Sequence, residues 1–102
     1  MKKYTVTTPF ETTQVTISVE RYANNNSLAL QLWCEDGPFA TLTVNINDQM
    51  AGADRAFVDT NDCPWAPSFI EENNLGRFTG YCGFSGRCAY PLYQFDIESI
   101  KA

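Results

Sequence analysis

The segment QVTISVERYANNNSLALQLWCEDGPFATLTVNI, residues 14–46, decides the fold because apolar and polar residues alternate along it three times. The first alternation, residues 14–20, precedes an asparagine run at 24–26, and the second occupies residues 28–34. The third follows the Asp-Gly-Pro sequence at 36–38. A period of two residues is typical of a strand with one buried face. The segment therefore predicts a meander of three adjacent antiparallel strands that share one apolar face.

The register of these strands follows from the apolar pattern, since a slip of one residue moves every side chain to the opposite face. A two-residue turn in the asparagine run pairs Ile17 with Leu32. A three-residue turn at 36–38 pairs Leu32 with Leu42 and keeps the apolar residues together. Trp33 falls on the polar face, where it is either covered by another segment or exposed for a partner.

Weaker strands flank the meander. They are predicted at residues 4–6, 56–59 and 93–97, with a loop at 47–55. We expect a single domain, residues 1–102, of the α+β class: a curved antiparallel sheet of about five strands in a meander, one short helix and a long loop of glycine and aromatic residues.

The stretch NDCPWAPSFIEENNLG, residues 61–76, predicts a stiff corner followed by a helix at 68–74. Pro64 and Pro67 flank Trp65, and proline suits a first helical turn because its backbone nitrogen carries no hydrogen to bond. We expect the indole of Trp65 to lie under the helix as part of the core. The corner is therefore given a structural role.

The same stretch supplies signals for the two ends of this helix. Asn61 and Asp62 offer side-chain caps at its start, and Gly76 is expected to stop it. Phe69 and Ile70 lie where one face of the helix would meet the sheet. We assign Phe69 a structural role in the core.

Composition excludes several kinds of chemistry. The 102 residues carry a formal net charge of −5 and no histidine. An acidic surface repels phosphates, which argues against direct binding of nucleic acid. Without histidine the commonest general base and His-ligated metal sites are excluded. We therefore expect no enzyme, no catalytic residue and no cofactor.

The chain also lacks signals for membrane insertion or export. No stretch approaches the roughly 20 apolar residues of a spanning helix. No apolar region follows the lysines at residues 2–3, so no signal peptide is expected. We expect a cytoplasmic protein with no membrane partner.

The four cysteines give no recognised metal motif. Cys34, Cys63, Cys82 and Cys88 include no C-x-x-C pair, so no metal site is expected. A disulfide between Cys82 and Cys88 stays open for an oxidising compartment. Cys63, just before Pro64, is either a low-pKa thiol near a helix start or a buried, inert one. The absence of histidine favours the inert thiol.

Residues 76–88 hold four of the six glycines and predict a long loop. The candidate binding residues combine two arginines, three aromatic residues and two carboxylates: Arg77, Arg87, Phe78, Tyr81, Phe84, Asp59 and Asp62. Arginine and aromatic side chains together suit a carboxylate, a phosphate or a base. Alternatively, the arginines pair with Asp59 and Asp62 and tie the loop to the corner.

Two segments, AFVDTNDCPWAPSFIEENNLG at 56–76 and SGRCAYPLYQFDI at 85–97, carry a family resemblance. The chain resembles an uncharacterised domain-of-unknown-function family of small proteins from bacterial conjugative transposons and phages. Cys82 lies outside that family's pattern. The resemblance implies an accessory protein of a mobile genetic element and supplies no activity.

Three hypotheses follow. The first is a non-enzymatic accessory protein of a mobile element that binds another, unidentified protein. The second is an anti-restriction or anti-CRISPR inhibitor whose acidic surface mimics DNA. The third is a carboxylate-dependent hydrolase or nucleotide-binding enzyme, which requires Asp59 and Asp62 to converge in a pocket.

Overall fold

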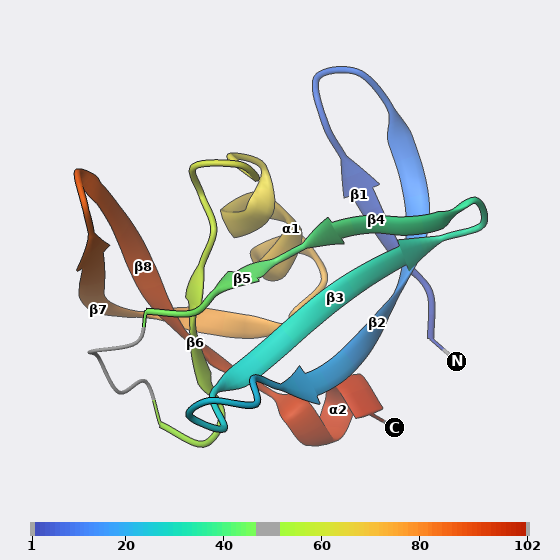
Figure 1. Cartoon of the computed structure of the whole chain (residues 1–102). Coiled ribbons are helices and arrows are strands. Elements are labelled where there is room, and N and C mark those ends of the chain that lie inside the picture. The colour runs from blue at the N-terminus through green and yellow to red at the C-terminus, as the bar shows by residue number, and fades with distance from the viewer. Residues whose placement is uncertain (1, 47–51, 102) are drawn as a thin grey trace.

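A computed structural model describes residues 2–46 and 52–101 (Figure 1). Within these ranges the elements run in the order β1 Tyr4–Thr7, β2 Thr12–Arg21, β3 Leu28–Cys34, β4 Gly37–Thr41, β5 Thr43–Val44, β6 Arg55–Val58, α1 Ala66–Glu72, β7 Gly76–Ser85, β8 Cys88–Phe95 and α2 Ile97–Lys101. Residues 47–51 of the predicted loop lie outside the described residues. No helix within the described ranges is long and apolar enough to cross a membrane.

The strands form two antiparallel sheets in the part of the chain that the structure describes. Their orders are β1-β2-β3-β4 and β5-β6-β8-β7, and they do not close into a barrel. The predicted α+β class with antiparallel strands is therefore confirmed. The expectation of one sheet of about five strands and one helix is too simple, because the chain leaves the first sheet within the third alternation and a second helix follows β8 (Figure 1).

The transfer between the sheets occurs at Leu42, which lies between β4 and β5. Its backbone N–H donates to the carbonyl of Leu30 in the first sheet, at 2.9 Å. Its carbonyl accepts the N–H of Asp59, which follows β6 of the second sheet, also at 2.9 Å. One residue is thus hydrogen-bonded to both sheets, and periodicity alone could not reveal this because each half of the segment still alternates.

The register between β2 and β3 is confirmed, with Ile17 opposite Leu32. The predicted register between β3 and β4 is wrong, because Leu32 lies opposite Ala40 and not opposite Leu42. A two-residue turn precedes Gly37, whose φ of 124° is accessible to glycine at little cost. A β-bulge after the turn then restores the alternation, so the apolar pattern did not require a three-residue turn.

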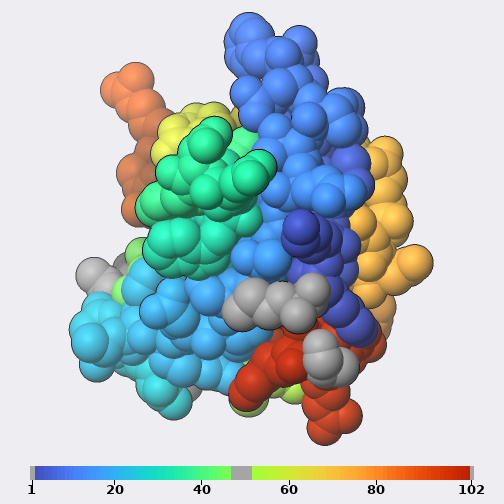
Figure 2. Space-filling view, turned by 90° about the vertical axis from the view of Figure 1, so that its right-hand side faces the viewer, coloured from blue at the N-terminus to red at the C-terminus, as the bar shows by residue number. Residues whose placement is uncertain are grey.

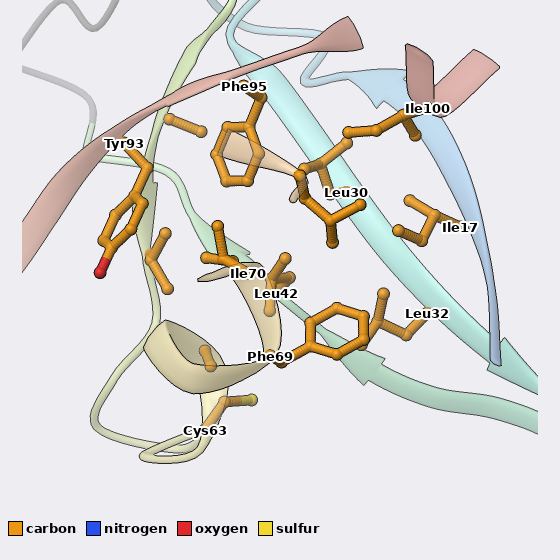
Figure 3. Packing of buried hydrophobic residues seen from close by; sticks show 14 of the residues in the cluster. Ile17, Leu30, Leu32, Leu42, Cys63, Phe69, Ile70, Tyr93, Phe95 and Ile100 are labelled. Atoms are coloured by element: carbon orange, nitrogen blue, oxygen red, sulfur yellow. The ribbon is translucent and has the colours of Figure 1, made fainter. Parts of the chain in front are cut away.

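The apolar core draws on both sheets and both helices (Figure 3). Leu30, Leu32 and Leu42 are fully buried, and Phe69 of α1 and Ile100 of α2 pack against the same cluster. Complete burial of one leucine contributes about 1.5–3 kcal/mol. Residues of the two sheets are therefore buried in one shared cluster.

The corner before α1 is built around aromatic contacts. Trp65 is half-buried, and its ring meets Phe39 at 5.9 Å and Phe69 at 6.0 Å between centroids, both edge-on. Pro64 precedes Trp65, and Pro67 lies in the first helical turn as expected. Trp65 therefore packs at the rim of the core, while Phe69 enters it.

The predicted side-chain caps from Asn61 and Asp62 are wrong. The N-cap residue is Trp65, which provides no side-chain hydrogen bond. The carboxylate of Asp59 instead accepts the backbone N–H of Asp62 at 3.1 Å. This local turn forms upstream of the helix, so the polar side chains stabilise the approach to α1 and not its first turn.

The end of α1 also differs from expectation. Asn74, with a φ of 54°, adopts the left-handed conformation after the helix, which the sequence had assigned to Gly76. A Cβ on Gly76 would lie 2.3 Å from the carbonyl oxygen of Gln94, so glycine is needed there for close approach of β8. The predicted last strand ends at Phe95, and Ile97 begins α2.

Candidate functional site

The predicted glycine-aromatic loop at 76–88 is wrong in form, because most of it is strand β7 paired with β8. Ser85 lies opposite Cys88, and Gly86, at a φ of 61°, forms the turn with Arg87. Aromatic residues favour strands, and the glycines occupy the turn and a bulge without preventing pairing. Figure 2 shows the tip of this hairpin, in orange, standing clear of the body.

A bulge divides β7 into two parts. Between Phe78 and Cys82 the strand advances four residues while β8 advances two. Gly80, with a φ of 93°, lies in the bulge. Thr79 holds it, because its hydroxyl donates to the carbonyl of Leu92 at 2.8 Å and accepts the N–H of Tyr81 at 3.3 Å.

Three large aromatic side chains are exposed on β7. The exposed fractions are 47% for Phe78, 70% for Tyr81 and 63% for Phe84. β7 is an edge strand, so its outer side has no paired strand in the described residues. The other large apolar side chains exposed in the described chain are Phe10 and Trp33, on the first sheet. The three aromatic residues and this edge are called the β7 aromatic edge below.

The two candidate arginines lie at opposite ends of the β7 aromatic edge. Arg77 is at its base opposite Gln94, and Arg87 is in the turn at its tip. The intervening extended chain separates them by about 25 Å. Within residues 2–46 and 52–101, neither forms an ion pair, so the expected pairing with Asp59 and Asp62 is wrong. A paired strand holds the arginines apart, whereas a folded loop could have brought them together.

The two candidate carboxylates belong to the corner. Asp59 is half-buried and Asp62 is exposed, and the bond from the N–H of Asp62 gives the Asp59 carboxylate a structural role. Both carboxylates lie near Cys63 and affect the pKa of its thiol. Burial, and then the negative charges of these carboxylates, raise the pKa of the Cys63 thiol to about 11. The burial of Cys63 is confirmed, and its raised pKa favours the interpretation as an inert thiol.

The remaining cysteine question is settled by the hairpin register. Cys82 and Cys88 are free. Cys88 lies opposite Ser85, three residues from Cys82, so the two side chains project from opposite faces. Their separation along the strand is about 10 Å, beyond the usual reach of a disulfide. Among the described residues, no group of three or more Cys, Asp or Glu side chains could hold a metal ion.

Charge is unevenly distributed along the sequence. The hairpin, residues 76–95, contains two arginines and no acidic residue. The rest of the chain holds five basic and twelve acidic residues, a formal charge of −7. Acidic residues still lie close to the hairpin, because Asp96 lines a surface depression together with Arg77, and burial and then the charge of Glu71 raise the pKa of Tyr93.

A second surface feature lies on the first sheet. A groove of about 560 Å3 is lined by residues that include Lys3, Glu11, Trp33 and Glu35. The indole N–H of Trp33 donates to the hydroxyl of Ser18 at 2.9 Å, and 39% of the side chain is exposed. Sequence reasoning identified Trp33 on a polar face but did not predict the groove, because its walls come from separate hairpins.

Comparison with known proteins gives one match. A family model described as "Domain of unknown function (DUF4313)" matches residues 16–102. No curated protein and no solved structure matches the chain. The matched range includes the whole hairpin and the corner and begins within β2. The predicted resemblance to an uncharacterised family is thereby confirmed at that level.

Proposed function

The chain belongs to the family Domain of unknown function (DUF4313), and from this premise we propose that it is a non-enzymatic protein that binds another protein through the β7 aromatic edge. The carrying observation is the exposure of Phe78, Tyr81 and Phe84 on one edge strand. Grouped exposed apolar side chains mark interaction sites on soluble domains. Aromatic residues and arginine are also enriched in the energetically dominant parts of protein interfaces.

The exposure of these aromatic residues supports a role in binding. Phe78 contacts the ring of Tyr93 at 5.6 Å between centroids, yet nearly half of its surface is exposed. Tyr81 projects from the bulge and is the most exposed of the three. The exposed part of each ring is apolar area that a partner could bury, at roughly 25 cal/mol per Å2. Their exposed surface is therefore the part of the hairpin that we assign to partner binding.

The non-enzymatic part of the proposal is supported by the chemistry of the residues that are present. The chain has no histidine. The pKa of Cys63 is raised to about 11, which keeps the thiol protonated near neutral pH. The Asp59 carboxylate is engaged in the turn that leads to α1.

We further propose that the protein is an accessory factor of a mobile genetic element and acts in the cytoplasm. The first part rests on the resemblance carried by residues 56–76 and 85–97. The second is supported by the four free cysteines, which suit a reducing compartment.

The test is capture of a partner by crosslinking from a lysate of a natural host. The variant Phe78→Ser/Tyr81→Ser/Phe84→Ser is compared with the unmodified chain and with Phe10→Ser, which removes an aromatic ring that is 94% exposed on the first sheet. We expect the triple variant to lose the captured protein and Phe10→Ser to retain it. Thermal unfolding of each variant serves as the folding control. Equal capture by the triple variant would refute the proposal.

A second candidate is an inhibitor that mimics DNA, and it is favoured by the charge of −7 outside the hairpin. Such a protein would occupy the basic DNA channel of a restriction or CRISPR nuclease. Its test is competition between the protein and duplex DNA for a purified nuclease. This candidate predicts protection that weakens with salt and does not depend on Phe78, Tyr81 or Phe84. Loss of protection in the triple variant would contradict it.

A further inference from the structure

The long strand β2 is paired on only one side along each half of its length. Residues 12–15 pair with β1, and residues 16–21 pair with β3. The chain turns away beyond Trp33, the partner of Thr16, and Figure 1 shows the β1–β2 hairpin rising apart from the β3–β4 turn. Within the described residues, no strand therefore pairs with residues 12–15 on the side opposite β1. These four residues are called the open half of β2 below.

Two hydrogen bonds show which backbone groups of the open half have no strand beside them. In an antiparallel pair, alternate residues direct their N–H and C=O groups toward the same neighbouring strand. The N–H of Thr8 donates to the carbonyl of Glu11 in the register of β1 and β2, so odd-numbered residues of β2 bond toward β1. The N–H of Tyr22 donates to the carbonyl of Ser27 in the register of β2 and β3, so even-numbered residues bond toward β3. The even-numbered residues of the open half therefore point to the side that β3 has left.

A groove runs along these outward backbone groups, which belong to Thr12 and Gln14. It is the groove of about 560 Å3 on the first sheet, and residues 11–16 and 33–36 form most of its lining. Ligand sites commonly have volumes of roughly 300–1,000 Å3. An open strand edge recognises an extended peptide by pairing with it as an added strand, with pockets for alternate side chains. The groove therefore fits a segment in the strand conformation.

Charge and an aromatic ring select the side chains of this segment. Glu11, Glu35 and Asp36 line the groove, and Lys3 is the one basic residue among the described residues of its lining. Trp33 adds a partly exposed indole, whose N–H is held by a hydrogen bond within the same sheet. Lysine and arginine side chains are attracted both to carboxylates and to the face of an indole. The groove therefore favours a basic segment.

The two faces of the sheet give the segment an alternating pattern. Gln14 and Thr16 share the polar face with Trp33, which lies opposite Thr16. Val15 and Cys34 lie on the other face, where Val15 is buried and Cys34 packs against the core cluster. The side chains of an added strand alternate between the same two faces. Basic side chains on one face then meet Trp33, and apolar side chains on the other meet the rim of the core.

A second copy of this chain fits the groove less well than a basic segment does. Symmetric pairing of two open halves would bring the three carboxylates of each groove together with only one lysine from each copy. A nucleic acid would meet the same excess of carboxylates. Charge therefore favours a different protein as the occupant.

We propose that this groove binds an extended segment of a partner protein in which basic residues alternate with apolar ones, and that this segment joins β2 as an added strand. The two N–H and two C=O groups of Thr12 and Gln14 form its backbone hydrogen bonds. The basic side chains contact Trp33 and the carboxylates of the groove. This site belongs to the first sheet, whereas the β7 aromatic edge belongs to the second, so the inference goes beyond the proposed function.

The first test measures binding of fluorescently labelled peptides to the full chain by fluorescence anisotropy. The peptide VKVRVKV has the alternating pattern, and VEVEVEV reverses its charge. Two further peptides keep the sequence VKVRVKV and carry backbone N-methyl groups either on the basic residues or on the valines. An added strand bonds through alternate residues only, so one methylated peptide should bind at least about tenfold more weakly than VKVRVKV and the other within about threefold of it. VEVEVEV should bind at least about tenfold more weakly.

A proline in the open half tests the backbone contact from the side of the protein. Gln14→Pro removes an N–H that points away from β1, and proline is tolerated where the N–H of an edge faces solvent. This variant is expected to weaken binding of VKVRVKV by about tenfold or more. The matched control, Gln14→Ala, keeps the N–H and should weaken binding less than about threefold.

Charge-reversal variants test the contact with the carboxylates. Glu11→Lys/Glu35→Lys is expected to weaken binding of VKVRVKV by about tenfold or more. The matched control, Asp54→Lys/Glu98→Lys, makes the same change in net charge at exposed residues outside the groove and should weaken binding less than about threefold. Thermal unfolding checks that every variant remains folded.

The outcomes separate this inference from the proposed function. Equal binding of the two methylated peptides, no binding of VKVRVKV, or an unchanged affinity in Glu11→Lys/Glu35→Lys overturns the inference. A dimer in analytical ultracentrifugation that Gln14→Pro abolishes assigns the groove to a second copy and also overturns it. Phe78→Ser/Tyr81→Ser/Phe84→Ser should bind VKVRVKV as the unmodified chain does, and loss of binding there would move the peptide to the β7 aromatic edge. Partner capture that depends on those three residues leaves the proposed function standing in every case.

Discussion

Replacing Leu42 by alanine tests whether the two sheets share one core. The side chain is fully buried, and the backbone of the same residue bonds to both sheets. Leu→Ala changes at buried sites cost about 3–5 kcal/mol, through lost burial and the cavity that remains. A protein of this size is stable by about 5–15 kcal/mol in total. Leu42→Ala should therefore remove a large part of the stability and lower Tm by on the order of 15–25 °C.

The assay is urea unfolding followed by tryptophan fluorescence and circular dichroism. Trp33 reports on the first sheet, and Trp65 reports on the corner beside α1. Because both sheets contribute to one cluster, we expect a single transition with coincident midpoints and an m value close to that of the unmodified chain. Phe10→Ala, at an exposed site, should change the free energy of unfolding by less than about 0.5 kcal/mol.

Two results would refute this reasoning. A loss below about 1 kcal/mol in Leu42→Ala would show that the cavity collapses or that the packing at the transfer point is loose. Separate transitions for fluorescence and circular dichroism would show that the sheets unfold independently.

Further predictions concern glycine and cysteine. Gly76→Ala should destabilise the fold by about 2 kcal/mol or more, because the new Cβ would collide with the carbonyl of Gln94. Gly86→Ala has open space around its Cβ but keeps a positive φ, so it should cost about 1 kcal/mol. Chemical denaturation of the two variants compares their free energies of unfolding. Because the pKa of Cys63 is raised from 9.0 to about 11, the unfolded chain loses this proton first as pH rises. The contribution of the Cys63 thiol to the free energy of unfolding is complete below pH 9 and should fall by about 1–2 kcal/mol toward pH 11, after allowance for solvent screening. Cys63→Ala should lessen this dependence on pH, as measured by urea titrations at several pH values. A maleimide probe at pH 7.5 should label the exposed Cys82 within minutes and Cys63 only after unfolding, as read by peptide mass mapping; early labelling of Cys63 would contradict its burial.

The sequence was most informative where the apolar alternation alone fixes the register. Ile17 and Leu32 were paired correctly, although the predicted two-residue turn is wrong: the N–H of Tyr22 donates to the carbonyl of Ser27, and that of Asn26 to the carbonyl of Tyr22, so the loop is longer. The third alternation led to a wrong prediction of the partner strand. Leu42 fits the apolar alternation, but at this residue the backbone hydrogen bonds pass from the first sheet to the second. Hydrophobic period identifies a buried face, but it does not identify the partner strand.

The candidate site shows the same division. Phe78, Tyr81 and Phe84 were selected from the aromatic content of a glycine-rich stretch, and their exposure is now established, although their binding role stays a prediction. The separation of Arg77 from Arg87 could not be predicted, because it depends on pairing between β7 and β8. Glycine frequency indicated a loop, whereas the glycines serve a turn, a bulge and close strand contact.

The interrupted course of β7 has a consequence for solubility. An uninterrupted ten-residue edge carrying three exposed aromatic rings would be a template on which identical molecules could stack into fibrils. The kink at Gly80 breaks that template into short pieces that cannot align over their full length. We therefore expect that removal of the extra residues of the bulge would make the protein more prone to aggregate.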